Sequence, residues 1–212
     1  MRRRIPHPPS ANDTYSIVVI ASLTLSITAL WTQGKAGTFL LFNPVHHEWL
    51  DHFFKAETFV GDGWFSIILG LLLILNREKE RGIQVLAGFA ISGLLAQLIK
   101  SFVYAPRPMA LIPGSTYPYF LPDYTLNAWN SFPSGHTTSA FCFTAILAWS
   151  SGSNTFKFWL AIIALLTGYS RIYLGQHFPD DVISGALLGL FTAYAIRVFW
   201  PALSRSKSRV RT

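Results

Sequence analysis

Two histidines stand out because each lies in a polar stretch beside a strongly apolar one. His136 ends the stretch Pro-Ser-Gly-His and opens an apolar segment, whereas His177 precedes another such segment, with Asp181 four residues after it. Backbone N–H groups and an imidazole are costly beside an apolar segment unless they bind something polar. Histidine can also attack an electrophile or transfer a proton. The sequence therefore predicts that these two stretches bind a polar ligand.

Three basic residues accompany the two histidines. Lys100 and Arg171 come at the ends of apolar segments, and Arg107 lies between two prolines that keep it out of a helix. Ser134 and Gly135 would form the first turn of a helix, where free N–H groups and the helix dipole favour an anion. Three cations and a helix start together describe an anion site. In a membrane, the natural anion is a lipid phosphate.

The amino-acid composition indicates that this chain is a membrane protein. The chain has 212 residues, of which 51% are hydrophobic and 13% charged, and its mean hydropathy is +0.36. Soluble domains carry about 25% charged residues. The net charge of +7 is more typical of an oriented membrane protein than of a nucleic-acid binder. The single cysteine, Cys142, lies in an apolar run and excludes a disulfide framework within the chain.

The apolar segments predict an all-α fold, in which six transmembrane helices form one domain over residues 1–212. Basic tails are expected at 1–10 and 202–212. A spanning helix needs roughly 20 mainly apolar residues, so the shorter segments must include flanking polar turns. The predicted spans lie near residues 15–33, 61–76, 83–103, 133–150, 155–173 and 180–200.

The distribution of basic residues predicts which way the bundle faces. With six spans, twelve of the 17 Lys and Arg residues lie on the side of both termini, which makes that side cytoplasmic. The ends that carry Lys100, His136, Arg171 and His177 then face outward. The twelve are Arg2, Arg3, Arg4, Arg77, Lys79, Arg81, Lys157, Arg197, Arg205, Lys207, Arg209 and Arg211.

Three stretches also match a known family. KSFVYAPRP (100–108), PSGH (133–136) and SRIYLGQHFPDD (170–181) resemble, in order and spacing, the signature motifs of the type-2 phosphatidic acid phosphatases. This lipid phosphate phosphatase superfamily shares its site with vanadium haloperoxidases, and the resemblance is to its bacterial integral-membrane branch. It covers roughly residues 60–200 and implies the same six-helix plan.

The resemblance implies roles for the histidines and the carboxylates. His177 would be the nucleophile that forms a phosphohistidine, and Asp181 would hold its reactive tautomer. Asp180 is the alternative residue for holding the His177 tautomer, although its position after Pro179 favours a role as the cap of the sixth helix. His136 would be the general acid for the leaving oxygen. A lone His136 could instead merely cap its helix.

The remaining motif residues would bind the phosphate. Ser134 and Gly135 would cradle it, while Lys100, Arg107 and Arg171 would hold its oxygens as charge redistributes in the transition state. This chemistry needs neither a metal nor another cofactor. Lys100 and Arg171 could alternatively be ordinary lysine and arginine side chains that snorkel to the membrane interface.

The expected function is lipid phosphate hydrolysis at the outer face of a bacterial inner membrane. Undecaprenyl diphosphate is the first substrate choice for a compact chain with an outward site. Phosphatidylglycerophosphate, phosphatidic acid and lipid A phosphates are alternatives. A non-catalytic phospholipid binder or transporter is the alternative from another class, and a vanadate haloperoxidase is a weaker one. The expected partners are the lipid and the bilayer, without nucleic acid.

Outside the motifs, other polar and aromatic residues suggest weaker features. His46, His47 and Glu48 could suggest a metal site, but adjacent residues do not converge as ligands, so a polar outer loop is favoured. Asp62 is expected to cap the second helix. Interfacial aromatic residues are predicted at Trp49, Trp64, Tyr117, Tyr119, Tyr124 and Trp129.

Overall fold

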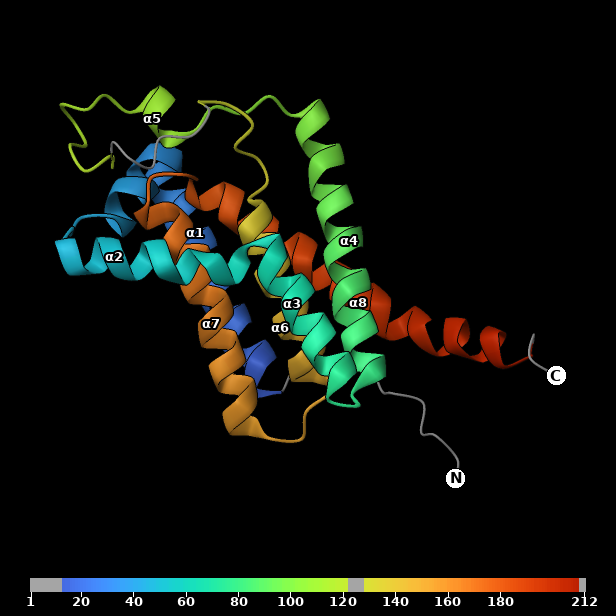
Figure 1. Ribbon diagram of the computed structural model, residues 1–212. Coiled ribbons are helices and arrows are strands. Elements are labelled where there is room, and N and C mark those ends of the chain that lie inside the picture. The colour runs from blue at the N-terminus through green and yellow to red at the C-terminus, as the bar shows by residue number, and fades with distance from the viewer. Residues whose placement is uncertain (1–12, 122–127, 210–212) are drawn as a thin grey trace.

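The computed structural model describes residues 13–121 and 128–209, with side chains described as far as Pro201 (Figure 1). Within these residues all regular structure is helical, which confirms the predicted all-α class. Arg2, Arg3, Arg4, Tyr124 and Arg211 lie outside the described residues. The elements are α1 (Thr14–Phe42), α2 (Glu48–Glu57), the 3₁₀ helix η1 (Thr58–Gly61), α3 (Gly63–Leu75), α4 (Lys79–Phe102), α5 (Pro108–Leu111), α6 (Gly135–Trp149), α7 (Asn154–Tyr173) and α8 (Pro179–Arg209).

Each predicted span corresponds to one helix: α1, α3, α4, α6, α7 or α8. Among the described helices, Thr14–Phe42, Lys79–Phe102 and Pro179–Pro201 are long and apolar enough to cross a membrane. A fourth crossing results if Glu48–Gly61 and Gly63–Leu75, which meet at 57°, form one broken span. Helix α6 has only 15 residues and falls short of the usual length. Three or four crossings therefore meet these criteria.

Helix α6 forms the centre of the bundle and packs against α4, α7 and α8. Its contact with α8 is close because α8 presents glycines at positions 185 and 189. A Cβ at Gly185 would lie 2.6 Å from the Ser134 carbonyl oxygen, so only glycine lets the helices approach this far. Small residues commonly permit such approach between membrane helices. The start of α6 is thereby held against the start of α8.

Local signals place the helix ends. Asp62 caps α3 by accepting a hydrogen bond from the Trp64 N–H at 2.9 Å, as predicted. Helix α8 begins with Pro179, which suits the first helical position, and has Asp180 and Asp181 in its first turn. Helix α1 is interrupted at Gly34, whose φ of 68° and ψ of 179° are non-helical.

The connections that carry the motifs gather at one end of the molecule. The C-terminal end of α4, α5 and the loop that leads down into α6 lie at the top of Figure 1, and the α3–α4 and α6–α7 connections lie at the bottom. Helix α2 crosses in front of α7 near the upper end. The fold thus brings the three motif stretches together.

Candidate active site

His177 lies in the connection between α7 and α8, and the first turn of α8 brings Asp181 beside it. Both side chains are buried, and His177 Nδ1 is 3.5 Å from Asp181 Oδ2. Ser131 bridges them: its Oγ is 3.2 Å from His177 Nδ1 and donates to Asp181 Oδ2 at 2.5 Å. The Phe178 N–H also donates to this carboxylate oxygen, at 2.9 Å. With Nδ1 held in this way, Nε2 is the ring nitrogen left for chemistry.

The surroundings of His177 favour its neutral form. Burial lowers the pKa of His177 well below its usual range, and the positive charges of Arg171, Arg107 and Lys100 lower it further. At neutral pH the imidazole therefore carries a lone pair, which nucleophilic attack requires. The three sequence-predicted cations act electrostatically on one histidine, although they come from distant parts of the chain.

The two arginines are held in place by specific partners. Arg171, in the last turn of α7, is almost fully buried and donates from Nη1 to Thr58 Oγ1 at 2.6 Å. Arg107 donates from Nη1 to Gln176 through the backbone carbonyl at 3.2 Å and the side-chain Oε1 at 3.0 Å. Its Nε donates to the Trp129 carbonyl at 3.2 Å. Arg107 is thus anchored beside the residue that precedes His177.

Lys100 reaches the loop before α6. Its ammonium donates to the Asn130 carbonyl oxygen at 2.6 Å and lies 3.5 Å from the Ser131 carbonyl oxygen. An ammonium has three donors, so these contacts leave Lys100 able to bind a phosphate oxygen as well. In this structure Lys100 positions the loop that carries Ser131.

The turn before α6 contains Ser134, which is hydrogen-bonded, and Gly135, which borders open space. The Ser134 N–H donates to the Asp181 carbonyl at 3.0 Å, and Ser134 Oγ accepts from Thr137 Oγ1 at 2.8 Å, so Ser134 ties α6 to α8. A Cβ on Gly135 would meet no atom within 4 Å. The helix start therefore borders open space at Gly135, where an anion would be expected.

His136 occupies the second position of α6, at the same end of the bundle. Gly61 packs directly against it, since a Cβ at Gly61 would lie 2.8 Å from both the Cβ and the carbonyl oxygen of His136. Thr167 Cγ2 also packs against Gly61, 2.7 Å from the same Cβ position. The end of η1 therefore fixes the backbone from which the His136 side chain extends.

Four residues at this site are not among the sequence-predicted set. Ser131 lies three residues before Ser134, and its hydroxyl was the only local signal. Gln176 precedes His177, whereas Thr58 and Lys35 come from segments without a motif. Lys35 Nζ pairs with Asp180 at 2.9 Å, so the Asp180 side chain, expected to cap α8, is engaged by a lysine of α1.

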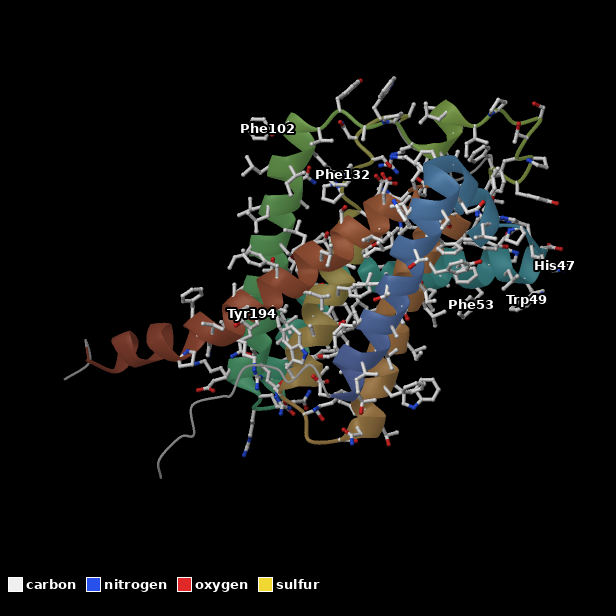
Figure 2. The ribbon with its side chains drawn as sticks, turned by 180° about the vertical axis from the view of Figure 1, so that it is seen from behind. His47, Trp49, Phe53, Phe102, Phe132 and Tyr194 are labelled. Atoms are coloured by element: carbon white, nitrogen blue, oxygen red, sulfur yellow. The ribbon has the colours of Figure 1, made fainter. Side chains whose placement is uncertain are left out.

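The alternative metal site at positions 46–48 does not form. His46 turns inward and stacks between Tyr119 and Tyr173, with ring centroids 4.6 and 4.3 Å away. His47 and Glu48 are exposed, and Figure 2 shows His47 at the far end of α2 with Trp49 and Phe53. Across residues 13–121 and 128–201, no group of three or more His, Cys, Asp or Glu side chains is placed to hold a metal ion.

Tyr117, which was expected at the membrane interface, instead packs beside His46. Tyr117 is only 2% exposed, and its hydroxyl lies 2.6 Å from both His46 Nε2 and Asn43 Nδ2. It packs inside rather than at a membrane surface because its hydroxyl finds buried partners. Asn43 also donates to the Ile172 carbonyl at 2.9 Å, which links this cluster to the residue after Arg171.

Comparison with known proteins gives consistent matches. Phosphatidylglycerophosphatase B of Bacillus subtilis (strain 168) is 26% identical over 180 residues, which cover 78% of this chain and 82% of that protein. An undecaprenyl-diphosphatase of Sulfolobus acidocaldarius is 33% identical over 130 residues, covering 60% and 59% of the two chains. The crystal structure of Aquifex aeolicus LpxE superposes with a TM-score of 0.63 at 31% identity, covering 77% of this chain and 94% of that one.

The family model of the PAP2 superfamily matches residues 81–205, more than half of the chain. All three motif stretches fall inside that range. Members of this family are lipid phosphatases, and the apolar helices agree with a membrane location. The chain therefore belongs to the PAP2 superfamily, the type-2 phosphatidic acid phosphatases.

Proposed function

We propose that this protein is an integral-membrane phosphatase that hydrolyses a lipid phosphate monoester or diphosphate through a phosphohistidine. The buried His177–Asp181 pair carries the proposal, because Nδ1 is held while burial and the nearby cations keep the imidazole neutral. A non-catalytic lipid binder has no use for an oriented nucleophile. The proposed enzyme is one membrane-embedded domain over residues 1–212.

In the first step, His177 Nε2 attacks phosphorus while Asp181 and Ser131 hold the proton on Nδ1. The P–N bond forms, the bond from phosphorus to the leaving oxygen breaks, and His136, which begins the step as the protonated imidazolium, gives that oxygen a proton and becomes neutral. In the second step, water attacks the phosphohistidine and gives a proton to His136. The P–N bond breaks, so phosphate is released and both histidines return to their starting states.

The proposed phosphate-binding groups surround this reaction path. Arg171, Arg107 and Lys100 would stabilise the oxygens that share negative charge in the transition state. The Gly135 N–H would contribute from the start of α6, where the structure leaves open space. Ser134 would act by fixing this turn against the Asp181 carbonyl.

Undecaprenyl diphosphate is the first proposed substrate, and phosphatidylglycerophosphate, phosphatidic acid and lipid A phosphates are the alternatives. The similar proteins act, by name, on more than one of these lipids. The test is phosphate release by the purified protein, compared as kcat/KM across the four lipids. We expect the highest value for undecaprenyl diphosphate. If the protein binds these lipids but hydrolyses none, it is a lipid binder instead.

Catalysis is expected to need no metal, because His177 supplies the nucleophile and the cations supply the charge stabilisation. Activity should remain unchanged in excess EDTA. Vanadate, which imitates five-coordinate phosphorus, should inhibit in competition with the lipid. Activity that disappears in EDTA and returns with magnesium would contradict this prediction.

We propose that six helices span the membrane and that the site opens to its outer side. Helix α6 would be a short span that its neighbours shield from lipid. Arg77, Lys79, Arg81 and Lys157 lie by the connections at the bottom of Figure 1, opposite the site. The positive-inside rule makes their side cytoplasmic. This orientation is what the next prediction tests.

Single cysteines at Ser115 and Ser153 should report opposite sides of the membrane. Both residues are exposed, whereas the native Cys142 is buried and can be replaced by serine. In intact cells, a membrane-impermeant thiol reagent should label Ser115→Cys but not Ser153→Cys; both should react after permeabilisation. The reverse pattern would invert the topology and remove the outer-leaflet assignment.

A further inference from the structure

Lys35 enters the candidate site from α1, far from every motif in the sequence. The break at Gly34 precedes it, and its ammonium lies 2.9 Å from Asp180 Oδ2 and 3.9 Å from Asp181 Oδ1. The same ammonium lies 4.5 Å from the centre of the Phe178 ring. Two carboxylates and an aromatic face therefore hold one cation beside the residue that orients His177.

The two oxygens of Asp181 have unequal surroundings. Oδ2 accepts hydrogen bonds from Ser131 and Phe178 and faces His177. Oδ1 is buried and has no hydrogen-bond partner among the described residues. A buried carboxylate is stable in its charged form only when it is paired. Lys35 supplies the nearby positive charge on the side of Oδ1.

We infer that Lys35 is a positioning residue for the reaction, which acts through Asp181 on His177. This inference rests on the proposed function. The Lys35 charge favours the ionised form of Asp181. Ionised Asp181 accepts the hydrogen bond of Ser131, whose Oγ faces His177 Nδ1, and it stabilises the positive charge that His177 gains when Nε2 attacks. Asp180 serves this arrangement by anchoring Lys35.

The pair of Lys35 and Asp180 can be altered without opening the protein core. Their side chains are 33% and 28% exposed, whereas Asp181 is completely buried. Substitution should therefore affect the charge near Asp181 more than the packing of α8. This separation makes the inference testable by kinetics.

The experiment measures kcat and KM for phosphate release by Lys35→Met, Lys35→Arg, Asp180→Asn and the double variant Lys35→Met/Asp180→Asn. For Lys35→Met we expect kcat to fall about 10- to 100-fold, the size of effect known for losing the outer partners that orient metal-binding residues. KM should change little, because Lys35 is not one of the proposed phosphate-binding groups and its charge is engaged by Asp180 and Asp181. Lys35→Arg should restore most of kcat because it keeps the charge.

Asp180→Asn should lower kcat in the same direction, because the lysine loses its anchor. The double variant should be no worse than Lys35→Met within about twofold, since the two residues act as a unit. Lys55→Met is the matched control, because Lys55 is a lysine of α2 outside the candidate site, and it should keep normal kinetics.

The inference is overturned if Lys35→Met keeps kcat within about twofold of the unmodified protein, or if Lys35→Arg is as impaired as Lys35→Met. If Lys35→Met does not insert stably into the membrane, the kcat of Asp180→Asn is the test instead. An unchanged kcat for that variant overturns the inference. An unmodified protein that hydrolyses no lipid phosphate would overturn the proposed function itself. If the unmodified protein is active and Lys35→Met keeps its kcat, only the inference about Lys35 is overturned.

Discussion

Replacement of His177 by alanine is expected to abolish lipid phosphate hydrolysis, with kcat lower by about 10⁴-fold or more. The imidazole is the proposed nucleophile, and alanine has no group that could replace it. In the unmodified protein, a rapid quench with ³²P-labelled lipid should trap an acid-labile phosphohistidine. The variant should trap none.

The exposed His47 provides a matched control, because His47→Ala removes an imidazole outside the candidate site. Its kinetics should stay normal. Asp181→Asn should trap phosphohistidine slowly, since Ser131 and His177 lose the negative charge that orients them. Circular dichroism should show unchanged helix content in all variants. Phosphohistidine in His177→Ala would show that the nucleophile has been misassigned.

Gly135→Ala is expected to lower kcat/KM about 10²- to 10³-fold, because the new methyl group would keep the phosphate away from the Gly135 N–H, which is as costly as losing that donor. In the protein without substrate the new methyl group meets no atom within 4 Å, so folding and insertion should be unaffected. A phosphate at the start of α6 would occupy that space and collide with the methyl group. Vanadate inhibition should weaken in parallel.

Gly152→Ala is the control for this prediction. Gly152 also has open space around its Cβ position, but it lies in the α6–α7 connection at the opposite end of the bundle. It should retain full activity and full vanadate sensitivity. Normal vanadate sensitivity in Gly135→Ala would mean that phosphate does not bind against this turn.

Helix positions and caps could be predicted from the sequence because they depend on neighbouring residues. Apolar runs located all six long helices, and Asp62 was recognised as a cap from its place before α3. The number of membrane crossings did not follow from the apolar runs alone. Three or four crossings meet the length and hydropathy criteria, and the 15-residue α6, which is shielded by other helices, is not one of them. Shielding is a property of packing rather than of local composition.

The candidate site also contains residues that the sequence identifies and residues that only the fold brings in. Lys100, Arg107, Ser134, Gly135, His136, Arg171, His177 and Asp181 could be nominated from the sequence because they fall in three short stretches with distinctive spacing. Those stretches converge only in the folded protein. Residue type and spacing therefore determined which groups could bind and attack a phosphate.

Only the tertiary structure decided what supports those groups. Ser131 bridges His177 and Asp181, Thr58 holds Arg171, and Lys35 reaches Asp180 across 145 positions of sequence. None of these pairings follows a helical or motif period. They arise because the break at Gly34, the 3₁₀ turn η1 and the glycine contacts between α6 and α8 set how distant backbones approach, and that long-range geometry is not encoded in any local pattern.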